Sequence, residues 1–594
     1  MASQFISNSN VTYDIASDGT TTVSHDITLE NVTSDFYATS YTLSLSGITP
    51  INPVASESGQ NLPVKITQSN GTTNLEVDFP DAVVGQGQKR EFVISFQDKT
   101  LVNKNGEIWE ITTPRLGDAT SFDGYSTTLK VPDVFGNLAY ISPNPTNKSA
   151  DKNQNVYNFD KNASLKTTIT AAFGNFQVFS FNLTYHLENP LNQTATTTIA
   201  LPPDTNYQKI NLVSIDPRPL KIDIDTDGNW IATYELKPQQ KVDVKATGAV
   251  QLFANAQTNP KPDYTKVTSD LGATDLWQVN DLKIQTLAKQ LKTPQAIYNY
   301  VTTHLSYDYA RVAPNVQRLG AVGALNNPTQ AICTEFTDLF VALARAAGIP
   351  AREIEGYAYT ENPQIQPLSL VADVLHAWPE YWDDKTQAWI PVDPTWGSTS
   401  GIDYFNKLDL RHFAFVIHGE DDKKPYPAGS YKLGTNPQKD VDVQFGSLPA
   451  NRISKLSITR TVTSQLPFSD EIVDVKLANS GPVAIYDADF GVSFDNKLQP
   501  KQNIISIIPP YGYYETNVDI PYSFLGQKTP EKIDLSVNGN NLSEFTSYKV
   551  FVTLSNLLLM CLVVFALVFM IYLAFRDAKA KKHSGESGSL PVQK

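Results

Sequence analysis

The feature that most constrains this chain is an apolar run from Phe551 to Phe575 that contains no Asp, Glu, Lys or Arg. As a helix, a run of this length extends roughly 37 Å at 1.5 Å per residue, which is enough to cross a hydrocarbon core of about 30 Å with some tilt. A buried helix of a soluble domain is usually shorter. The run therefore predicts one transmembrane helix over 550–575.

Positive charge follows this run, in Arg576, Lys579, Lys581 and Lys582, whereas only Lys549 lies close before it. This bias predicts a cytoplasmic tail over 576–594 and an extracytoplasmic 1–548. Such an orientation needs an export signal, and the N-terminal MASQFISNSN has no apolar h-region. We favour a removed signal, the alternative being a tail-anchored protein that faces the cytoplasm. We thus expect a single-pass protein of the cell membrane with most of its chain extracytoplasmic.

Length, net charge and cysteine content limit the number of domains and the kinds of partner and site that this chain can have. A chain of 594 residues is too long for one hydrophobic core, so several domains are expected. The net charge of −14 argues against a nucleic acid partner, because phosphate binding needs clustered Lys and Arg. The two cysteines, Cys333 and Cys561, can form neither a disulfide framework nor a cysteine-based zinc site. Cys561 lies within the apolar run, which leaves Cys333 alone in the soluble part.

Alternating apolar and polar residues dominate both flanks of the soluble part. They predict a β-rich module over 1–175, a β-sandwich-like module over 176–260 and an Ig-like β-sandwich stalk over 445–545. Helical spacing and then strands fill 265–430. The fold class is therefore multidomain: N-terminal all-β modules, an α+β core, a C-terminal β-sandwich and one transmembrane helix.

Cys333 opens a segment with helical periodicity. One helical face would carry Phe336, Leu339, Phe340, Leu343 and Ala347. Gly348 and Pro350 would end the helix, and Asn326 to Pro328 would break the chain before it. A cysteine at the N-terminus of a helix is favoured as the thiolate, which is the nucleophilic form.

A base and an orienting acid follow in two predicted strands. His376 lies in LHAWPEYW and Asp393 ends WIPVD, with a turn at 383–387 between them. Antiparallel pairing would bring Asp393 beside His376, so that one imidazole nitrogen binds the carboxylate and the other is left for Cys333. Each of the three residues alone would more often be structural. Together they form the pattern of a thiol enzyme.

The text ICTEFTDLFVALARAAGIPAREIEGY, then HAWPEYW, then WIPVDPTWG resembles the transglutaminase-like superfamily, and specifically a membrane-anchored microbial member. The resemblance covers roughly 285–415 and implies a papain-like core over 265–430. It implies Cys333 as nucleophile, His376 as base and Asp393 as orienter, and a structural role for Arg345 and Arg352.

The second oxyanion donor stays open, because Ile332 precedes the cysteine where many members have Gly or Gln. The backbone N–H of Cys333 is one donor, and Gln330 is a guess for the other. The chemistry demands no cofactor and no metal. The acidic segment from Asp223 to Asn229 lacks the spacing of a calcium loop and is interpreted as a hairpin turn.

The predicted function is a membrane-anchored cysteine enzyme that acts on amide bonds of protein or peptide substrates through an acyl-enzyme. Water as acceptor would give a protease or amidase, and an amine would give an acyltransferase; the sequence slightly favours hydrolysis. Two alternatives stay open: a non-catalytic surface-binding scaffold on the same fold, and a cell-wall-modifying accessory. The sequence does not determine the substrate or the oligomeric state.

Overall fold

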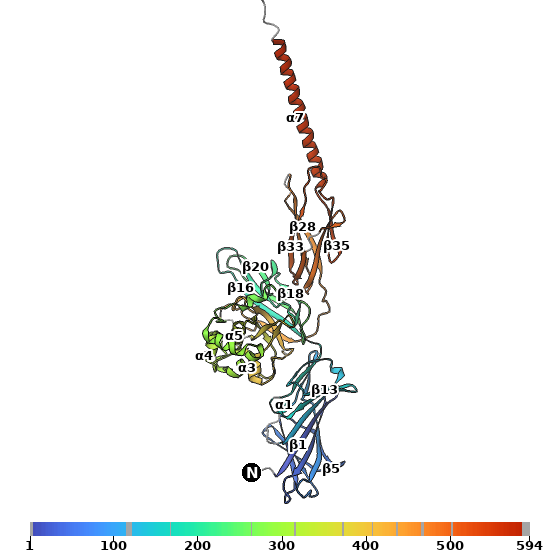
Figure 1. The fold of residues 1–594 in the computed structure, drawn as a ribbon, viewed down its shortest axis with the longest axis vertical. Helices are drawn as coiled ribbons and strands as arrows, with labels where there is room; N and C mark the ends of the chain where they lie inside the picture. The colour runs from blue at the N-terminus through green and yellow to red at the C-terminus, as the bar shows by residue number, and fades with distance from the viewer. Residues whose placement is uncertain are drawn as a thin grey trace, which may run out of the picture. The chain divides into compact units, whose positions relative to one another are not determined.

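The computed structural model describes residues 4–114, 122–166, 168–262, 264–313, 316–370, 373–406, 408–434, 438–464, 468–499 and 503–584. Part of the predicted tail, 585–594, lies outside them. The chain divides into two compact units, Met1–Arg452 and Ile453–Lys594. The predicted fold class is confirmed: β modules come first, an α+β core follows, and a β-sandwich precedes one apolar C-terminal helix (Figure 1).

The N-terminal module forms because its strands alternate buried and solvent-facing residues. In β1 (Phe5–Ile15), Val11, Tyr13 and Ile15 are buried, and they join the inward residues of the other sheets in one core. The largest sheet has the order β13 (Asn147–Asp151), β14 (Gln154–Asp160), β11 (Gly124–Pro132), β1, β2 (Thr21–Asn31), β8 (Lys89–Asp98), β4 (Ile51–Glu57), β5 (Gln60–Leu62). Two smaller sheets have the orders β3 (Ser40–Ser46), β7 (Thr72–Asp78), β6 (Val64–Ser69) and β12 (Leu138–Ser142), β15 (Thr170–Phe173), β10 (Ile108–Thr112), β9 (Val102–Asn105), with η1 (Asp133–Phe135) and α1 (Lys161–Lys166) beside them.

The second module contains two further sheets, with the orders β18 (Gln208–Asp216), β21 (Lys241–Phe253), β16 (Phe176–Glu188), β27 (Val441–Phe445) and β17 (Ala195–Leu201), β20 (Trp230–Leu236), β19 (Lys221–Ile224). The strand β27 comes from far along the sequence and pairs with β16, so the chain returns to this module after the α+β core. The acidic segment forms the predicted turn between β19 and β20, closed by the Asp225 N–H donating to the Asn229 carbonyl.

In the α+β core, helices pack against an antiparallel sheet whose strands differ in length. Its central helix, α5 (Cys333–Ala346), contacts the strands β22 and β24 and the helices α2, α3, α4 and α6. The sheet has the order β23 (Ser369–Leu370), β24 (Val374–Asp383), β22 (Ala351–Ala358), β26 (His412–His418), and β25 (Ala388–Pro391) pairs with β24. The remaining helices are η2 (Val267–Leu271), α2 (Leu282–Leu291), α3 (Pro294–His304), η3 (Tyr309–Arg311), α4 (Gly320–Asn326) and α6 (Pro394–Ser400).

The second unit is a β-sandwich followed by the apolar helix. Every second residue of β29 is buried, and the inward residues of both sheets share one core. The sheets have the orders β28 (Leu456–Ser464), β29 (Glu471–Asn479), β33 (Tyr513–Ile520) and β31 (Lys497–Leu498), β30 (Ile485–Phe494), β34 (Lys532–Val537), β35 (Asn540–Thr546), with β32 (Asn503–Ile508) also on β30. The helix α7 (Lys549–Ser584) continues from this sandwich and is long and apolar enough to cross a membrane (Figure 1).

Candidate active site

Cys333 is the first residue of α5, as the sequence predicts, and it is 3% exposed. Ile332 before it has an extended backbone and no polar side chain, so only half of a capping box forms. Glu335, in the first turn, accepts the Ile332 N–H at 3.0 Å through Oε2 and the Leu319 N–H at 2.9 Å through Oε1. This buried carboxylate therefore fixes the approach to Cys333 and ties it to the start of α4.

The helix α5 is enclosed on more sides than the sequence predicts. Phe336, Leu339, Phe340 and Leu343 are fully buried, but so is Asp338. Its carboxylate accepts the Trp277 Nε1–H at 2.9 Å and the Arg318 guanidinium at 2.9 and 2.6 Å. A buried carboxylate needs such partners. Because they come from segments distant in the sequence, the periodicity of the helix could not reveal them.

His376 and Asp393 are brought together by the predicted hairpin. The pairing of β24 with β25 ends at Glu380 opposite Pro391, and the Val392 N–H donates to the Pro379 carbonyl at 3.0 Å just beyond it. His376 and Asp393 each lie an even number of residues from the Glu380–Pro391 pair, which puts extended residues on the same face of the sheet. His376 Nε2 lies 2.9 Å from Asp393 Oδ2, and both side chains are fully buried.

The second ring nitrogen of His376, Nδ1, is unpaired among the described residues. Its Nδ1 is buried and forms no hydrogen bond with any residue that the structure describes. The rings of Trp378 and Trp396 lie 6.0 and 5.1 Å from the imidazole, centroid to centroid, and hold it in place. Burial lowers the pKa of His376, but Asp393 and the nearby Cys333 thiol raise it more, to about 9. A protonated imidazole beside a cysteine favours the thiolate over the thiol.

Asp393 is both a helix cap and the acceptor for His376. Its Oδ1 accepts the Trp396 N–H at 3.0 Å at the start of α6. Its Oδ2 faces His376 and, at 3.3 Å, His412 Nε2. Burial raises the pKa of Asp393, but the two imidazoles outweigh this and hold it well below its ordinary value. The turn-forming role and the orienting role of this residue are therefore compatible.

The structure thus places a helix-start thiol, an imidazole with one free nitrogen and an ionised carboxylate in one buried group. The sequence of residues 280–394 matches the transglutaminase-like superfamily. These residues form a transglutaminase-like domain. This confirms the family resemblance for that part of the chain.

Bacterial proteins show what this chain is similar to. One is a protein-glutamine gamma-glutamyltransferase of Pseudomonas aeruginosa, 26% identical over 206 residues, a match that takes in 33% of this chain and 30% of that protein. The chain thus spans under a third of that relative's length. A solved structure from Cytophaga hutchinsonii, provisionally described as a cysteine protease, is 16% identical with a TM-score of 0.28 over 46% of this chain and 99% of that one. The periplasmic domain of TgpA from Pseudomonas aeruginosa is 17% identical with a TM-score of 0.22 over 37% and 88%.

His412, at the start of β26, is a member of the site that sequence reasoning missed. Its Nδ1 lies 2.7 Å from Asp409 Oδ1, while its Nε2 faces Asp393. Burial lowers the pKa of His412, but Asp409 and Asp393 raise it to about 9. The only hint in the sequence is an Asp three residues before a His that opens an apolar strand.

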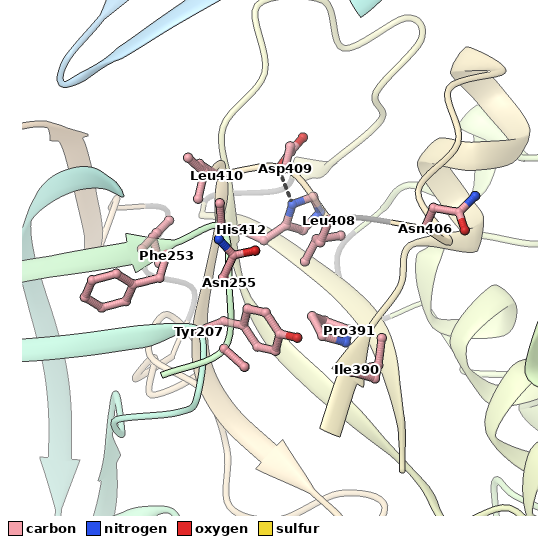
Figure 2. A pocket seen from close by; sticks show the side chains of 13 residues that line it. Tyr207, Phe253, Asn255, Ile390, Pro391, Asn406, Leu408, Asp409, Leu410 and His412 are labelled. Atoms are coloured by element: carbon pink, nitrogen blue, oxygen red, sulfur yellow. Dashed lines mark hydrogen bonds and ion pairs between the residues drawn. The ribbon is translucent and has the colours of Figure 1, made fainter. Parts of the chain in front are cut away.

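A cavity of about 330 Å³ reaches this side of the transglutaminase-like domain. Figure 2 shows Asp409 and His412 joined by their hydrogen bond on its wall, with Tyr207 and Leu410 beside them. Neither Cys333 nor His376 lines it. The cavity therefore lies against the hydrogen-bonded pair Asp409 and His412. It is not the place where a substrate carbonyl would meet the Cys333 thiol.

Tyr307 supplies a polar group near the thiol. Its hydroxyl is buried and has no hydrogen-bond partner among the described residues. Burial raises the pKa of Tyr307, and the charge of Cys333 raises it further. The backbone of Tyr307 bridges to Ala331, two residues before the cysteine. Gln330, the guess from sequence, is exposed.

A second buried cluster lies on the same domain, and we call it the arginine cluster: Arg318, Asp338, Glu353 and His418. Arg318 binds both Asp338 and Glu353 at 2.6 Å. His418 Nδ1 lies 3.1 Å from Glu353 Oε2, and its Nε2 donates to the Pro425 carbonyl at 2.8 Å. Its side-chain groups thus find partners within the cluster or beside it.

Two groups have metal-type ligand atoms within 4.8 Å of one another: His376, Asp393 and His412; and Glu353, Glu355 and His418. In the first, one carboxylate oxygen accepts from both imidazoles, and in the second Arg318 neutralises Glu353. In both groups the carboxylates are thus already paired with an imidazole or with Arg318. Arg345 and Arg352 serve packing: Arg345 donates to three backbone carbonyls, and Arg352 pairs with Glu380.

Proposed function

We propose that this chain is a membrane-anchored transglutaminase-like cysteine enzyme that acts on amide bonds of protein or peptide substrates. Cys333 is the nucleophile, His376 the acid–base group and Asp393 the orienter. The observation that carries the proposal is the buried, unbonded Nδ1 of His376 beside the Cys333 thiol, with Nε2 of the same ring held by Asp393. A structural histidine in so dry a place would have both nitrogens bonded.

In the first half-reaction, the Cys333 thiolate attacks the substrate carbonyl carbon and the C=O electrons move to oxygen. As the tetrahedral intermediate collapses, the C–N bond breaks and the imidazolium of His376 gives its proton to the leaving nitrogen. In the second half-reaction, neutral His376 takes a proton from water or an amine, which attacks the thioester and releases Cys333. Asp393 keeps the ring in one tautomer and stabilises the imidazolium each time it forms.

Two groups of this chain suit the developing oxyanion. The backbone N–H of Cys333 lies in the first turn of α5, where N–H groups have no partner inside the helix. The Tyr307 hydroxyl is buried, unpartnered and close to Cys333. We assign these as the two donors, in place of Gln330. Tyr307→Phe, which removes only the hydroxyl, should lower turnover by about 10²- to 10³-fold.

His412 acts through Asp393 and is a positioning residue. Held between Asp409 and Asp393, it keeps a positive charge beside the Asp393 carboxylate and shares its Oδ2. This arrangement supports an orienter that stays ionised although it is fully buried.

The acyl acceptor distinguishes hydrolysis from transamidation. The Pseudomonas relative is named for transfer from protein-bound glutamine. We therefore propose glutaminyl amides as the donor class to test first, with water and a primary amine offered together. Purified full chain would be incubated with a glutaminyl peptide and a fluorescent primary amine, and both ammonia and peptide-bound amine would be measured.

Amine incorporation that depends on Cys333 supports an acyltransferase, and ammonia or cleavage products alone support a hydrolase. Cys333→Ala is the matched control. If a thiol-reactive acyl probe labels Cys333 no faster in the wild type than in His376→Gln, and no amide is turned over, the scaffold alternative replaces the enzyme.

Membrane anchoring by α7, with the bulk of the chain extracytoplasmic, is supported by the apolar run and the positive charges after it. Protease added to intact cells should digest the large N-terminal part and spare the tail. Full protection of the chain would support the tail-anchored alternative that faces the cytoplasm.

A further inference from the structure

The first two turns of α7 belong to the sandwich. Tyr548 and Val552 are buried in the core that the two sheets share. Gly526, in the loop after β33, has a φ of +71° and leaves no room for a Cβ against Thr553. The loop and the helix start are thus packed together, and no flexible linker separates the sandwich from the apolar helix.

Asn556 marks the last point of this packing. It is 5% exposed, and its Nδ2 donates to the Tyr522 hydroxyl at 3.0 Å and to the Phe524 carbonyl at 2.7 Å. From Leu557 to Phe575 the helix has no partner among the described residues of the sandwich. As a helix, those residues are about 28 Å long, so they are sufficient by themselves to cross a hydrocarbon core of about 30 Å. The edge of the membrane therefore lies no further along the helix than Asn556.

The loop beside Asn556 exposes apolar side chains. Phe524 is 41% exposed and Leu525 38%, and Phe468, 57% exposed, packs edge-on against Tyr522 with ring centroids 6.1 Å apart. The outer face of the helix start is apolar too, with Val550, Phe551 and Leu554 exposed. Exposed aromatic and aliphatic side chains at the level where a span begins are suited to the lipid interface.

We propose that this end of the sandwich, formed by Phe468, Phe524 and Leu525 around the start of α7, inserts into the lipid headgroup layer and seats the sandwich on the bilayer. The inference rests on the proposed membrane anchor and commits to lipid as the partner. With the loop bonded to Asn556, the sandwich and the helix would then move as one body on the membrane surface.

The test uses single-cysteine full chains in phosphatidylcholine nanodiscs, in a Cys333→Ala background, each labelled with an environment-sensitive fluorophore. Native Cys561 reports on the span itself. Phe524→Cys and Leu525→Cys, with Cys561→Ala, report on the loop. Leu542→Cys is the matched control, because Leu542 is also apolar and 44% exposed but lies on β35, roughly 20 Å of strand before Tyr548.

Lipids brominated high in the acyl chain should remove most of the emission from labels at 524 and 525 and shift the remainder to the blue, while the label at 542 stays unquenched. Quenching at Cys561 but none at 524 and 525 overturns the inference and leaves the anchor intact. No quenching at Cys561 overturns the anchor and the inference together. Equal quenching of the labels at 524 and 542 also overturns the inference, since the sandwich would then have no end that preferentially contacts the lipid.

Discussion

Two buried histidine–carboxylate clusters in the α+β core differ in how the ring nitrogens of their histidines are used. In the arginine cluster, His418 uses both ring nitrogens, and Arg318 forms ion pairs with two carboxylates. In the cluster around the thiol, His376 uses one nitrogen and leaves the other open. Burial opposes charge in both. The saturated cluster joins α5 to β22 through Arg318, which binds Asp338 and Glu353, whereas the unsaturated cluster is the one for which we propose chemistry.

The largest expected effect tests the open cluster. Cys333→Ser should reduce turnover of a glutaminyl peptide by roughly 10⁵- to 10⁶-fold, because a hydroxyl is a far poorer nucleophile than a thiolate. The thermal midpoint of the domain should stay near that of the wild type. Turnover within tenfold of the wild type would place the nucleophile elsewhere.

Asp393→Asn should lower turnover by about 10⁴-fold and still leave a measurable rate, because the imidazole keeps a hydrogen bond but prefers the wrong tautomer. The fold should survive, since Asn also caps a helix well and can accept the Trp396 N–H. Circular dichroism and steady-state rates measure the two effects. Loss of folding with this variant would make Asp393 a structural cap first.

In the saturated cluster, the expected loss is one of stability. Arg318→Met leaves Asp338 buried without a cation and Glu353 with His418 alone, which should cost about 3–5 kcal/mol. The loss of stability is measured as faster amide hydrogen exchange in α5 and β22, followed by mass spectrometry. Lys65→Met is the matched control, because its ion pair with Glu76 is exposed and its loss should leave exchange in α5 and β22 unchanged.

The pH dependence of stability tests the role of His418 in the saturated cluster. Glu353 and Glu355 outweigh burial and raise the pKa of His418 to about 9, above the unfolded value of 6.5. The resulting stabilisation, up to about 3 kcal/mol, is complete below pH 6.5 and is lost as the pH rises through about 9. Thermal midpoints should fall across that window, and less steeply in His418→Gln. An equal slope in both proteins would contradict the role of His418.

The smallest effect concerns His412. His412→Gln keeps a hydrogen-bond donor for Asp393 but removes the positive charge, so turnover should fall about tenfold, or 1.4 kcal/mol. Asp393 then stabilises the His376 imidazolium more strongly, and the alkaline limb of the pH–rate profile should move to higher pH. A tenfold loss without that movement would indicate packing damage only.

The sequence alone determined the elements that carry the proposed triad. Periodicity and the break before it put Cys333 at the start of a helix, and two aromatic-rich strands with a short turn brought Asp393 to His376. Each inference needed only residues near one another in the chain, where spacing fixes geometry. The alternation in β1 and β29 was likewise local.

Only the tertiary structure decided which distant groups complete the site. His412 reaches Asp393 because β22 lies between β24 and β26 in the sheet, an order that no local pattern specifies. The contact of Arg318 with Asp338 on α5 also joins segments that no local pattern brings together. By hydropathy alone, the apolar span starts at Phe551. In the structure, however, the side chains of Val552 and Asn556 pack into the sandwich. Hydropathy reports how apolar a residue is, and the folded chain decides whether protein or lipid covers it.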